Sequence, residues 1–181
     1  MPFSIYEKSF AGAIDATAMF KLSYGLFVLT AREGKKDNGC IINTLQQVTT
    51  TPNKVSITVN KANYTHDMIM RTGEFNVSII SESAKFDMFK HFGFQSGRNV
   101  DKFKDCTPLR SDNGLVFLPR YINSFMSLKV ENYVDLDTHG MFICTVTESR
   151  VLGDKETMTY SYYHKVIKGV SPKNAPTYIA E

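Results

Sequence analysis

The sequence contains few cysteines, and they form no recognisable pattern. Cys40, Cys106 and Cys144 are odd in number, far apart in the chain and without a CxxC pair. This spacing argues against a disulfide framework and against a cysteine-based metal site, so no metal ligand is assigned. We therefore expect a reducing, cytoplasmic setting.

Long runs of one charge and long apolar runs are also absent. The 21 basic and 18 acidic residues give a net charge of +3 and are spread along the chain. Nucleic acid is therefore not an expected partner, whereas a small anionic ligand is easily accommodated. No segment approaches the roughly 18 apolar residues that a membrane span requires, and the first ten residues do not resemble an export signal. The sequence thus predicts no membrane association.

Standard catalytic motifs are missing as well. The chain has no GxSxG elbow, Walker loop, GxGxxG or HExxH motif, and its four histidines, at positions 66, 91, 139 and 164, are far apart. Catalysis by protein side chains alone is therefore not expected. A borrowed cofactor would explain the lack of a nucleophile, because the protein then only has to bind, orient and tune that cofactor.

Apolar patterning in the first half predicts strands and short helices. The 181 residues, 43% of them hydrophobic, suit a single domain. Strands are expected at 24–33, 39–48, 54–60 and 74–81, and helices at 66–72 and 83–93. In the turn GKKDNG, the Asn-Gly pair is expected to supply the positive φ of a tight reversal. Thr65 is expected to cap the first helix and Gly73 to end it.

The second half predicts a barrel. Further strands are expected at 115–121, 124–136, 140–152 and 157–166, which brings the total to about eight. So many strands with only two or three short helices favour a closed or split antiparallel barrel over a parallel sheet. The C-terminal segment has two prolines and little periodicity, so we interpret it as a loose arm or an intersubunit connection.

One uncharged polar stretch needs a hydrogen-bonding partner. Residues 38–52, NGCIINTLQQVTTTP, look buried but contain Asn43, Thr44, Gln46 and Gln47. Burying such groups unpaired costs about 1–3 kcal/mol each. Two explanations stay open: the amides pair within the sheet or at a subunit contact, or they bind a flat heteroaromatic ring whose developing negative charge fixed dipoles would stabilise.

The stretch 60–69, NKANYTHDMI, is a candidate anion site. Lys61, Asn63 and Thr65 stand at the entrance of the helix expected at 66–72, where unpaired N–H groups attract negative charge. The alternative is that Thr65 only caps the helix and Lys61 is solvated.

Taken in order, these segments resemble the flavin reductase family with the FMN-binding split-barrel fold, most closely its flavoredoxin-like branch. The pattern comprises YGLFVLTA, NGCIINTLQQVTTTP, VSITVNKANYTHDMIMRTGEFNVSII, FGFQSGRNVDKF, HGMFICTVTESRVL and MTYSYYHK, and covers about residues 15–168. The branch includes the flavin domain of high-molecular-weight rubredoxins, in which a rubredoxin module follows. The tail APTYIAE is similar to such a junction, but no CxxC follows it here.

The resemblance implies a fold, a cofactor and partners. The fold is a mainly β, FMN-binding split β-barrel (Greek-key-like) with two or three short helices over residues 1–168, followed by a C-terminal tail over 169–181. The protein would be a homodimer that binds FMN noncovalently near the subunit contact, and NAD(P)H would deliver a hydride to the flavin.

Site residues are carried over by position. The ring would lie along Cys40, Ile41, Ile42, Asn43 and Thr44, and the ribityl phosphate near Lys61, Asn63 and Thr65. Ser96, Arg98 and Lys102 are further candidate contacts for the phosphate or the nicotinamide nucleotide, with ordinary surface charge as the alternative for Arg98 and Lys102.

The remaining carried-over residues lie late in the chain or depart from the family pattern. His139 matches a position near the nicotinamide and is the catalytic candidate, unless it is an ordinary surface residue. One of Tyr162 and Tyr163 would form a pocket wall or pack within a strand. Ile41 and Ile42 are bulkier than the small residues often found there, which favours a retained cofactor.

Three functions follow from these expectations. The first is an oxidoreductase that uses NAD(P)H to reduce bound or free flavin and passes electrons on. The second is a flavoredoxin-type electron carrier with tightly bound FMN and a protein redox partner such as a rubredoxin. The third is a flavin-binding barrel without redox activity.

Overall fold

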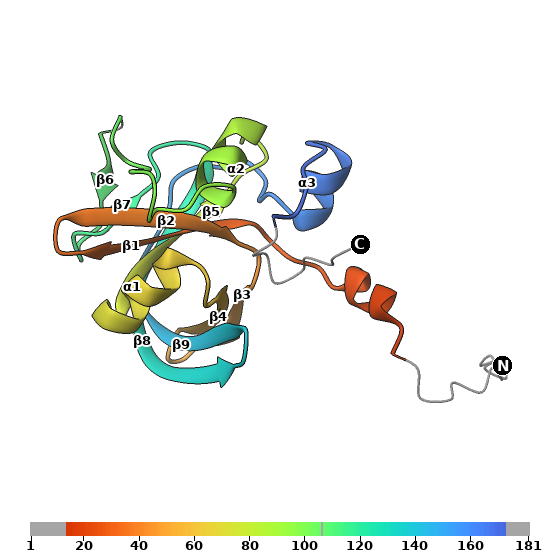
Figure 1. Ribbon diagram of the computed structural model, residues 1–181. Helices are drawn as coiled ribbons and strands as arrows, with labels where there is room; N and C mark the ends of the chain where they lie inside the picture. The colour runs from red at the N-terminus through yellow and green to blue at the C-terminus, as the bar shows by residue number, and fades with distance from the viewer. Residues whose placement is uncertain (1–13, 106, 173–181) are drawn as a thin grey trace, which may run out of the picture.

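The computed structural model describes residues 14–105 and 107–172, and most of its regular structure is β (Figure 1). Seven strands form an antiparallel sheet: β1 (Phe27–Glu33), β2 (Lys36–Ile42), β3 (Leu45–Thr49), β4 (Lys54–Asn60), β5 (Glu74–Ile80), β8 (Ile122–Leu136) and β9 (His139–Val151). The short strands β6 (Leu109–Arg110) and β7 (Val116–Phe117) pair with each other, and the helices are α1 (Tyr64–Thr72), α2 (Phe86–Gly93), α3 (Tyr160–Lys165) and the 3₁₀ helix η1 (Ala16–Lys21).

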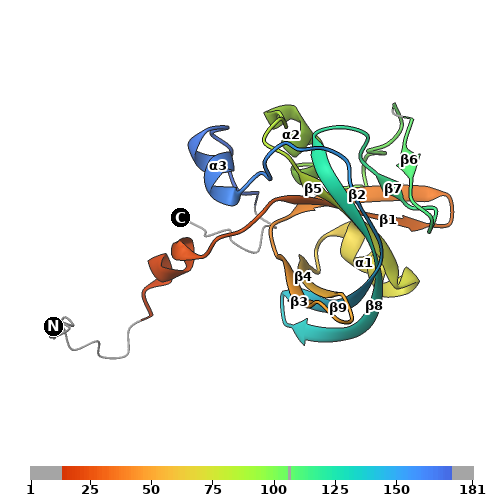
Figure 2. The same cartoon turned by 180° about the vertical axis from the view of Figure 1, so that it is seen from behind.

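The large sheet curls into a barrel that stays open at one seam. Its strand order is β2-β1-β5-β8-β9-β4-β3, so β2 and β3 are the two edges although only Asn43 and Thr44 separate them in the chain. Figures 1 and 2 show α2 and α3 on the same side of the β1–β2 layer and α1 on the other side, toward β3 and β4. At this seam one side of β2 pairs with no other strand of the described residues, so its backbone groups can bind a ligand.

The hairpin between the first two strands turns earlier than the sequence predicted. Gly34 takes the positive φ of +59° at the turn, and Asn38 and Gly39 lie inside β2, paired with Ala31 and Thr30. The prediction of a reversal at Asn-Gly was wrong because Gly34 satisfies the same backbone requirement four residues earlier. As a result Asn38 is carried into the structure, with only 2% of its surface exposed.

Several expected elements are confirmed, with corrected ends. Strand β4 has the predicted bounds and alternates buried and half-buried residues. Gly73 ends α1 in the left-handed conformation, with φ +72°. Helix α1 begins earlier than expected, however, and Asn63 is its N-cap; Thr65 lies within the first turn and is buried, so it is not the cap.

The last predicted strand is a helix. Residues Tyr160–Lys165 form α3, and the Thr159 hydroxyl caps it by accepting a hydrogen bond from the Tyr162 N–H. The run of tyrosines suggested a strand because aromatic residues are common in sheets, but Tyr160 and Tyr163 lie three positions apart and both pack inward from one helix face. The strand expected at 115–121 is also much shorter, being only β7.

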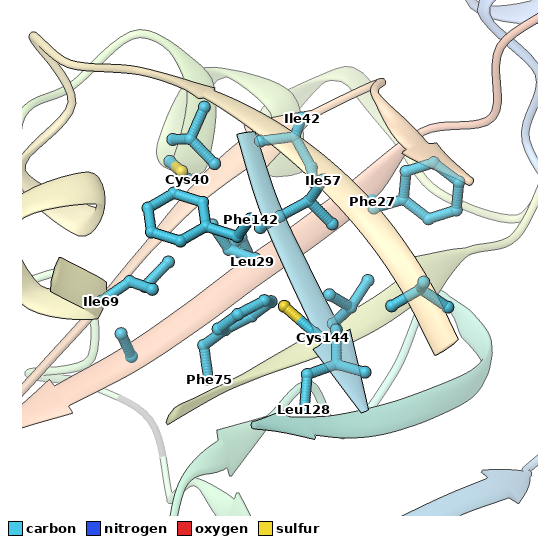
Figure 3. Packing of buried hydrophobic residues seen from close by; sticks show 14 of the residues in the cluster. Phe27, Leu29, Cys40, Ile42, Ile57, Ile69, Phe75, Leu128, Phe142 and Cys144 are labelled. Atoms are coloured by element: carbon cyan, nitrogen blue, oxygen red, sulfur yellow. The ribbon is translucent and has the colours of Figure 1, made fainter. Parts of the chain in front are cut away.

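Two apolar clusters hold these layers together. One fills the barrel interior and includes Leu29, Ile57, Phe75 and Phe142, with α1 contributing Ile69 (Figure 3). The other lies between the outer face of β1 and β5 and the helices α2 and α3. Burying each such large side chain contributes about 1.5–3 kcal/mol, so the sheet and its covering helices are firmly joined. Among the described helices, none is long and apolar enough to span a membrane.

Candidate functional site

A cleft of about 560 Å³ opens beside β2, between the start of α1 and the segment that follows α2. This volume lies within the roughly 300–1,000 Å³ of small-molecule sites. Six of the residues singled out from the sequence line it: Cys40, Ile41, Asn63, Thr65, Ser96 and Lys102. A smaller apolar pocket adjoins the cleft and is lined by Ile41, Ile42 and Asn43. Residues as far apart in the sequence as Cys40 and Lys102 thus meet at one place.

The start of α1 forms one wall of the cleft. Ala62, Asn63, Tyr64 and Thr65 all line it, and no side chain caps the helix. The first N–H groups of a helix and its dipole favour an anion at this end. The Tyr64 ring is flanked by two cations, since Lys36 Nζ and Arg98 Cζ each lie 4.8 Å from its centroid. This end of the cleft is therefore positively polarised.

Lys102 places a buried ammonium in the cleft wall. The residue is 5% exposed, and its Nζ donates hydrogen bonds to the carbonyls of Gly39 at 2.7 Å and Phe92 at 2.9 Å. Burial lowers the pKa of this ammonium, and the nearby Cys40 acts in the opposite direction. Among the described residues, no carboxylate forms an ion pair with it. A buried cation without a counter-charge is costly, so an anionic ligand group would fit here.

Asn38 and Cys40 complete the polar floor of the cleft. Asn38 Nδ2 donates to Thr65 Oγ1 at 2.9 Å, while Asn38 Oδ1 is buried without a hydrogen-bond partner in the structure. Burial raises the pKa of the Cys40 thiol, and the Thr65 hydroxyl and Lys102 act in the opposite direction. Cys40 is therefore a neutral thiol while buried, without the lowered pKa of an activated catalytic cysteine.

The uncharged stretch that follows β2 divides between two environments. Asn43 is 4% exposed beside the apolar pocket. Thr44 Oγ1 donates to the Thr58 carbonyl at 2.6 Å and lines neither hollow. Gln46 and Gln47 lie exposed on the edge strand β3, so water can satisfy their amides. The expectation that this whole stretch is buried was wrong, because only its first half faces the protein interior.

Two cationic candidates, Lys61 and Arg98, lie outside the lining of the cleft. Lys61 forms an ion pair with Asp135, which raises the pKa of Lys61. Arg98 pairs with Asp67 while lying over Tyr64, and lines an open groove next to the cleft. Lys61 therefore has a counter-charge that Lys102 lacks.

His139, the catalytic candidate, lies at the start of β9 opposite Asn60 of β4. Its Nδ1 is 2.8 Å from the Thr138 hydroxyl, and its Nε2 is buried without a hydrogen-bond partner in the structure. His66 is nearby, and its Nε2 lies 3.5 Å from the Tyr133 hydroxyl. Burial lowers the pKa of both imidazoles, so both are neutral near pH 7.

Sequence reasoning missed some of the lining residues. Tyr163 does form a wall of the apolar pocket, as one of the two alternatives for it allowed. Asn38, Tyr64 and Gly97 were overlooked, although the aromatic ring beside the proposed anion site was a usable signal. Ser171 and Pro172 line both hollows, and nothing local in the sequence indicated this.

A flavin mononucleotide fits the chemistry of this site. An anionic phosphate suits the uncapped start of α1 and the buried Lys102 ammonium. The edge strand β2 offers backbone donors and acceptors to a planar ring, and Ile41 and Ile42 offer apolar contact.

Comparison with known proteins identifies relatives over most of the chain. It is 38% identical over 165 residues to the high molecular weight rubredoxin of Moorella thermoacetica, covering 91% of this chain and 72% of that protein. It is 30% identical over 165 residues to the ferric-chelate reductase (NAD(P)H) of Archaeoglobus fulgidus, covering 91% of this chain and 98% of that protein.

Solved structures share the fold. The NADH:FAD oxidoreductase of Streptomyces globisporus aligns with a TM-score of 0.70 at 19% identity, covering 78% of this chain and 83% of that one. Flavoredoxin of Methanosarcina acetivorans aligns with a TM-score of 0.65 at 17% identity, covering 84% and 76%. The split-barrel expectation is confirmed. Residues 19–171 match the flavin reductase like domain, and the chain belongs to that family.

Proposed function

We propose that this protein binds FMN in the cleft beside β2 and uses NAD(P)H to reduce bound or free flavin, passing the electrons on. The observation that carries this proposal is the buried Lys102 ammonium, which lines the cleft and has no carboxylate partner among the described residues. A bound flavin supplies the redox chemistry, because it takes up a hydride and releases electrons singly or in pairs.

The protein groups would divide the work of binding. Lys102 and the first N–H groups of α1 hold the phosphate, with Asn63 and Ser96 as additional donors. The backbone of Cys40–Asn43 faces the ring, and its fixed dipoles stabilise negative charge on the ring without reorganising. His139, as a neutral imidazole, remains the catalytic candidate that would lie near the nicotinamide.

Absorbance of the purified protein tests this proposal directly. A yellow protein, or one that turns yellow with added FMN and is bleached by NADH or NADPH, supports it. Steady-state oxidation of the nicotinamide with excess FMN then measures turnover. A colourless protein that takes up no FMN would rule out both redox functions.

The second candidate is an electron carrier with retained FMN. Ile41 and Ile42 favour it, because their bulk narrows the site near the ring, and Ser171 and Pro172 add contacts by lining both hollows. A yellow protein that is photoreducible but inert to NADH and NADPH would support this function over the first. Its redox partner would be a small protein such as a rubredoxin.

We further propose that two copies assemble through the outer face of β4, β8 and β9. Val134, Met141 and Thr58 form one cross-strand row of this face, and Asn132, Ile143 and Ser56 form the next. The face carries no charge in these rows, and Val134 and Leu136 are 45% and 41% exposed. Such uncharged, partly apolar surfaces are typical of interfaces. Light scattering of the protein and of Val134→Glu tests this assembly, which we expect Val134→Glu to disrupt.

The remaining expectations are proposals as well. We propose residues 1–168 as the flavin-binding domain and 169–181 as a tail, of which 173–181, including the sequence that is similar to a rubredoxin junction, lies outside the described residues. A cytoplasmic location is supported by the free, buried thiols of Cys40 and Cys144; Cys106 is outside the described residues.

A further inference from the structure

The segment Gly169–Pro172 borders both hollows of the candidate site. Ser171 and Pro172 line both the cleft and the apolar pocket, and Val170 lines the pocket. The two hollows also share Ile41, on β2, which is the strand along which the ring would lie. A ligand that fills both hollows must therefore meet this segment, which we call the strap.

Helix α3 holds the strap by polar contacts. The Tyr163 hydroxyl donates to the Val170 carbonyl at 3.1 Å, and the Tyr160 hydroxyl bonds to the Ser171 hydroxyl. The Gly169 N–H donates to the Tyr163 carbonyl at 3.1 Å, and the Gly169 carbonyl accepts from His164 Nδ1 at 2.9 Å. Each of the first three strap residues is thus tied to α3.

The close approach at the start of the strap requires a glycine. A Cβ on Gly169 would lie 1.9 Å from Cζ of the Tyr163 ring. The ring itself cannot give way easily, because Tyr163 is 4% exposed and packs on Phe89 with ring centroids 4.6 Å apart. The fold therefore fixes the base of the strap on a rigid helix.

Beyond that base, little apolar burial holds the strap in place. Val170 is 57% exposed, and Ser171 and Pro172 are half-buried. A segment with few buried apolar contacts and a handful of hydrogen bonds opens at a small fraction of the free energy of global unfolding. The strap can thus move away from both hollows while α3 stays packed.

We propose that Gly169–Pro172 is a gate whose opening sets the rate at which flavin enters and leaves the cleft, with Tyr160 and Tyr163 as its positioning residues. The identity of the ligand as flavin rests on the proposed function, whereas the opening of the strap does not. The gate decides whether FMN is exchanged between turnovers or retained through many of them, which separates a flavin reductase from an electron carrier.

Alkylation of Cys40 tests the gate without any flavin. Cys40 lines the cleft and is 7% exposed, whereas Cys144 is fully buried in the barrel interior and reports on global opening. The full chain carrying Cys106→Ser is treated with N-ethylmaleimide, and the modified peptides are quantified over time. Tyr160→Phe/Tyr163→Phe in this background removes two of the strap hydrogen bonds. Tyr162→Phe is the matched control, because no hydrogen bond joins its hydroxyl to the strap in the described structure.

We expect Cys40 in the double variant to react about five-fold faster or more, since losing two hydrogen bonds shifts a local opening equilibrium by at least that order. Cys144 should be unaffected, and Tyr162→Phe should behave like the parent. Equal Cys40 rates in all three proteins would overturn the gate. Acceleration of Cys40 and Cys144 together would also overturn it, because the whole barrel would then be opening.

Stopped-flow binding of FMN gives the second readout. A gate accelerates association and dissociation by similar factors and leaves the dissociation constant within about two-fold. Faster dissociation with unchanged association would mean that the strap is an ordinary ligand contact, which contradicts the proposal. If no variant binds FMN, the proposed function fails, and Cys40 alkylation still decides whether the strap is a gate.

Discussion

The ammonium of Lys102 donates a hydrogen bond to the main-chain carbonyl of Gly39, at 2.7 Å, across 63 residues of chain. The second bond, to the Phe92 carbonyl, joins the end of α2 to the same point. A buried cation is thus fixed beneath the edge strand that borders the cleft. Its position depends on main-chain atoms of two elements, so we expect it to be the same with and without a ligand.

Replacing Lys102 by methionine should weaken FMN binding about 10- to 100-fold, because a charged hydrogen bond to phosphate is worth about 1.5–3 kcal/mol. Riboflavin lacks the phosphate, so its affinity should change by less than about three-fold. Flavin fluorescence titration measures both. Thermal unfolding of the variant should shift little, since removing a buried charge offsets the loss of two hydrogen bonds. Equal losses for FMN and riboflavin would remove Lys102 from the phosphate site.

Lys61→Ala is the matched comparison. Lys61 is bound to Asp135 at the protein surface, and exposed ion pairs contribute only about 0–1 kcal/mol to stability. The sequence made Lys61 a phosphate ligand, which would cause a clear loss of FMN affinity in the alanine variant. The geometry favours an affinity within about two-fold of the parent, because the charge is already compensated. The titration thus shows whether Lys61 or Lys102 binds the FMN phosphate.

Gly97 lines the cleft at the point where Asn38 packs against the backbone. A Cβ at this position would lie 1.9 Å from Asn38 Oδ1, and Asn38 is held by its bond to Thr65. Gly97→Ala should therefore destabilise the protein by about 1–3 kcal/mol, as overpacking does, and weaken FMN binding. Gly153→Ala is the control, since a Cβ there meets nothing within 4 Å. Urea unfolding of both variants checks the difference, and equal midpoints would contradict this account.

Local patterns predicted the parts of the fold that depend on local physics. Strand β4 alternates buried and half-buried residues over its whole length, and Gly73 is needed where the backbone turns left-handed. Helix α3 was wrongly predicted as a strand because tyrosine is common in strands, whereas in the fold the packing of Tyr163 on Phe89 favours the helix. Tertiary contact overrode the residue preference there.

The candidate site was predictable to a similar extent. Asn43 was identified because polar side chains in an apolar stretch need partners, and the start of α1 because helix starts attract anions. Cys40, Ile41 and Ile42 were identified only through the family resemblance. The choice between Lys61 and Lys102 as the buried cation was not accessible, since it depends on which lysine finds a carboxylate in three dimensions. The strap was not predicted because Ser171 and Pro172 line the hollows only as a result of the tertiary fold, and neither residue type indicates a ligand site in the sequence.

His139→Ala should leave flavin binding unchanged and slow the oxidation of NADH or NADPH. The residue does not line the cleft, but its Nε2 is buried and lacks a partner within the described structure. We expect about a 10- to 100-fold loss in kcat/KM if this nitrogen contacts the nicotinamide, in line with the loss of one positioned polar group. His139→Gln retains a donor and should recover part of the rate. An unaltered rate in His139→Ala would remove the residue from the site.

The free energy of unfolding should fall as the pH drops, because the folded protein holds a buried His66 and a half-buried His139 as neutral rings. Burial lowers the folded-state pKa of His66 and of His139, while the unfolded chain titrates near the ordinary value of about 6.5. Below about pH 6.5 the unfolded state therefore binds more protons, and each histidine can cost up to about 1.4 kcal/mol per pH unit until its folded pKa is reached. Above that pH the loss is absent. Asp67 and Asp135 face His66 and oppose its shift, whereas Lys61 adds to it. Urea unfolding between pH 5 and pH 7.5 should show this decline, and His139→Gln should reduce its slope; an identical slope in the variant would show that His139 titrates alike in the folded and unfolded states.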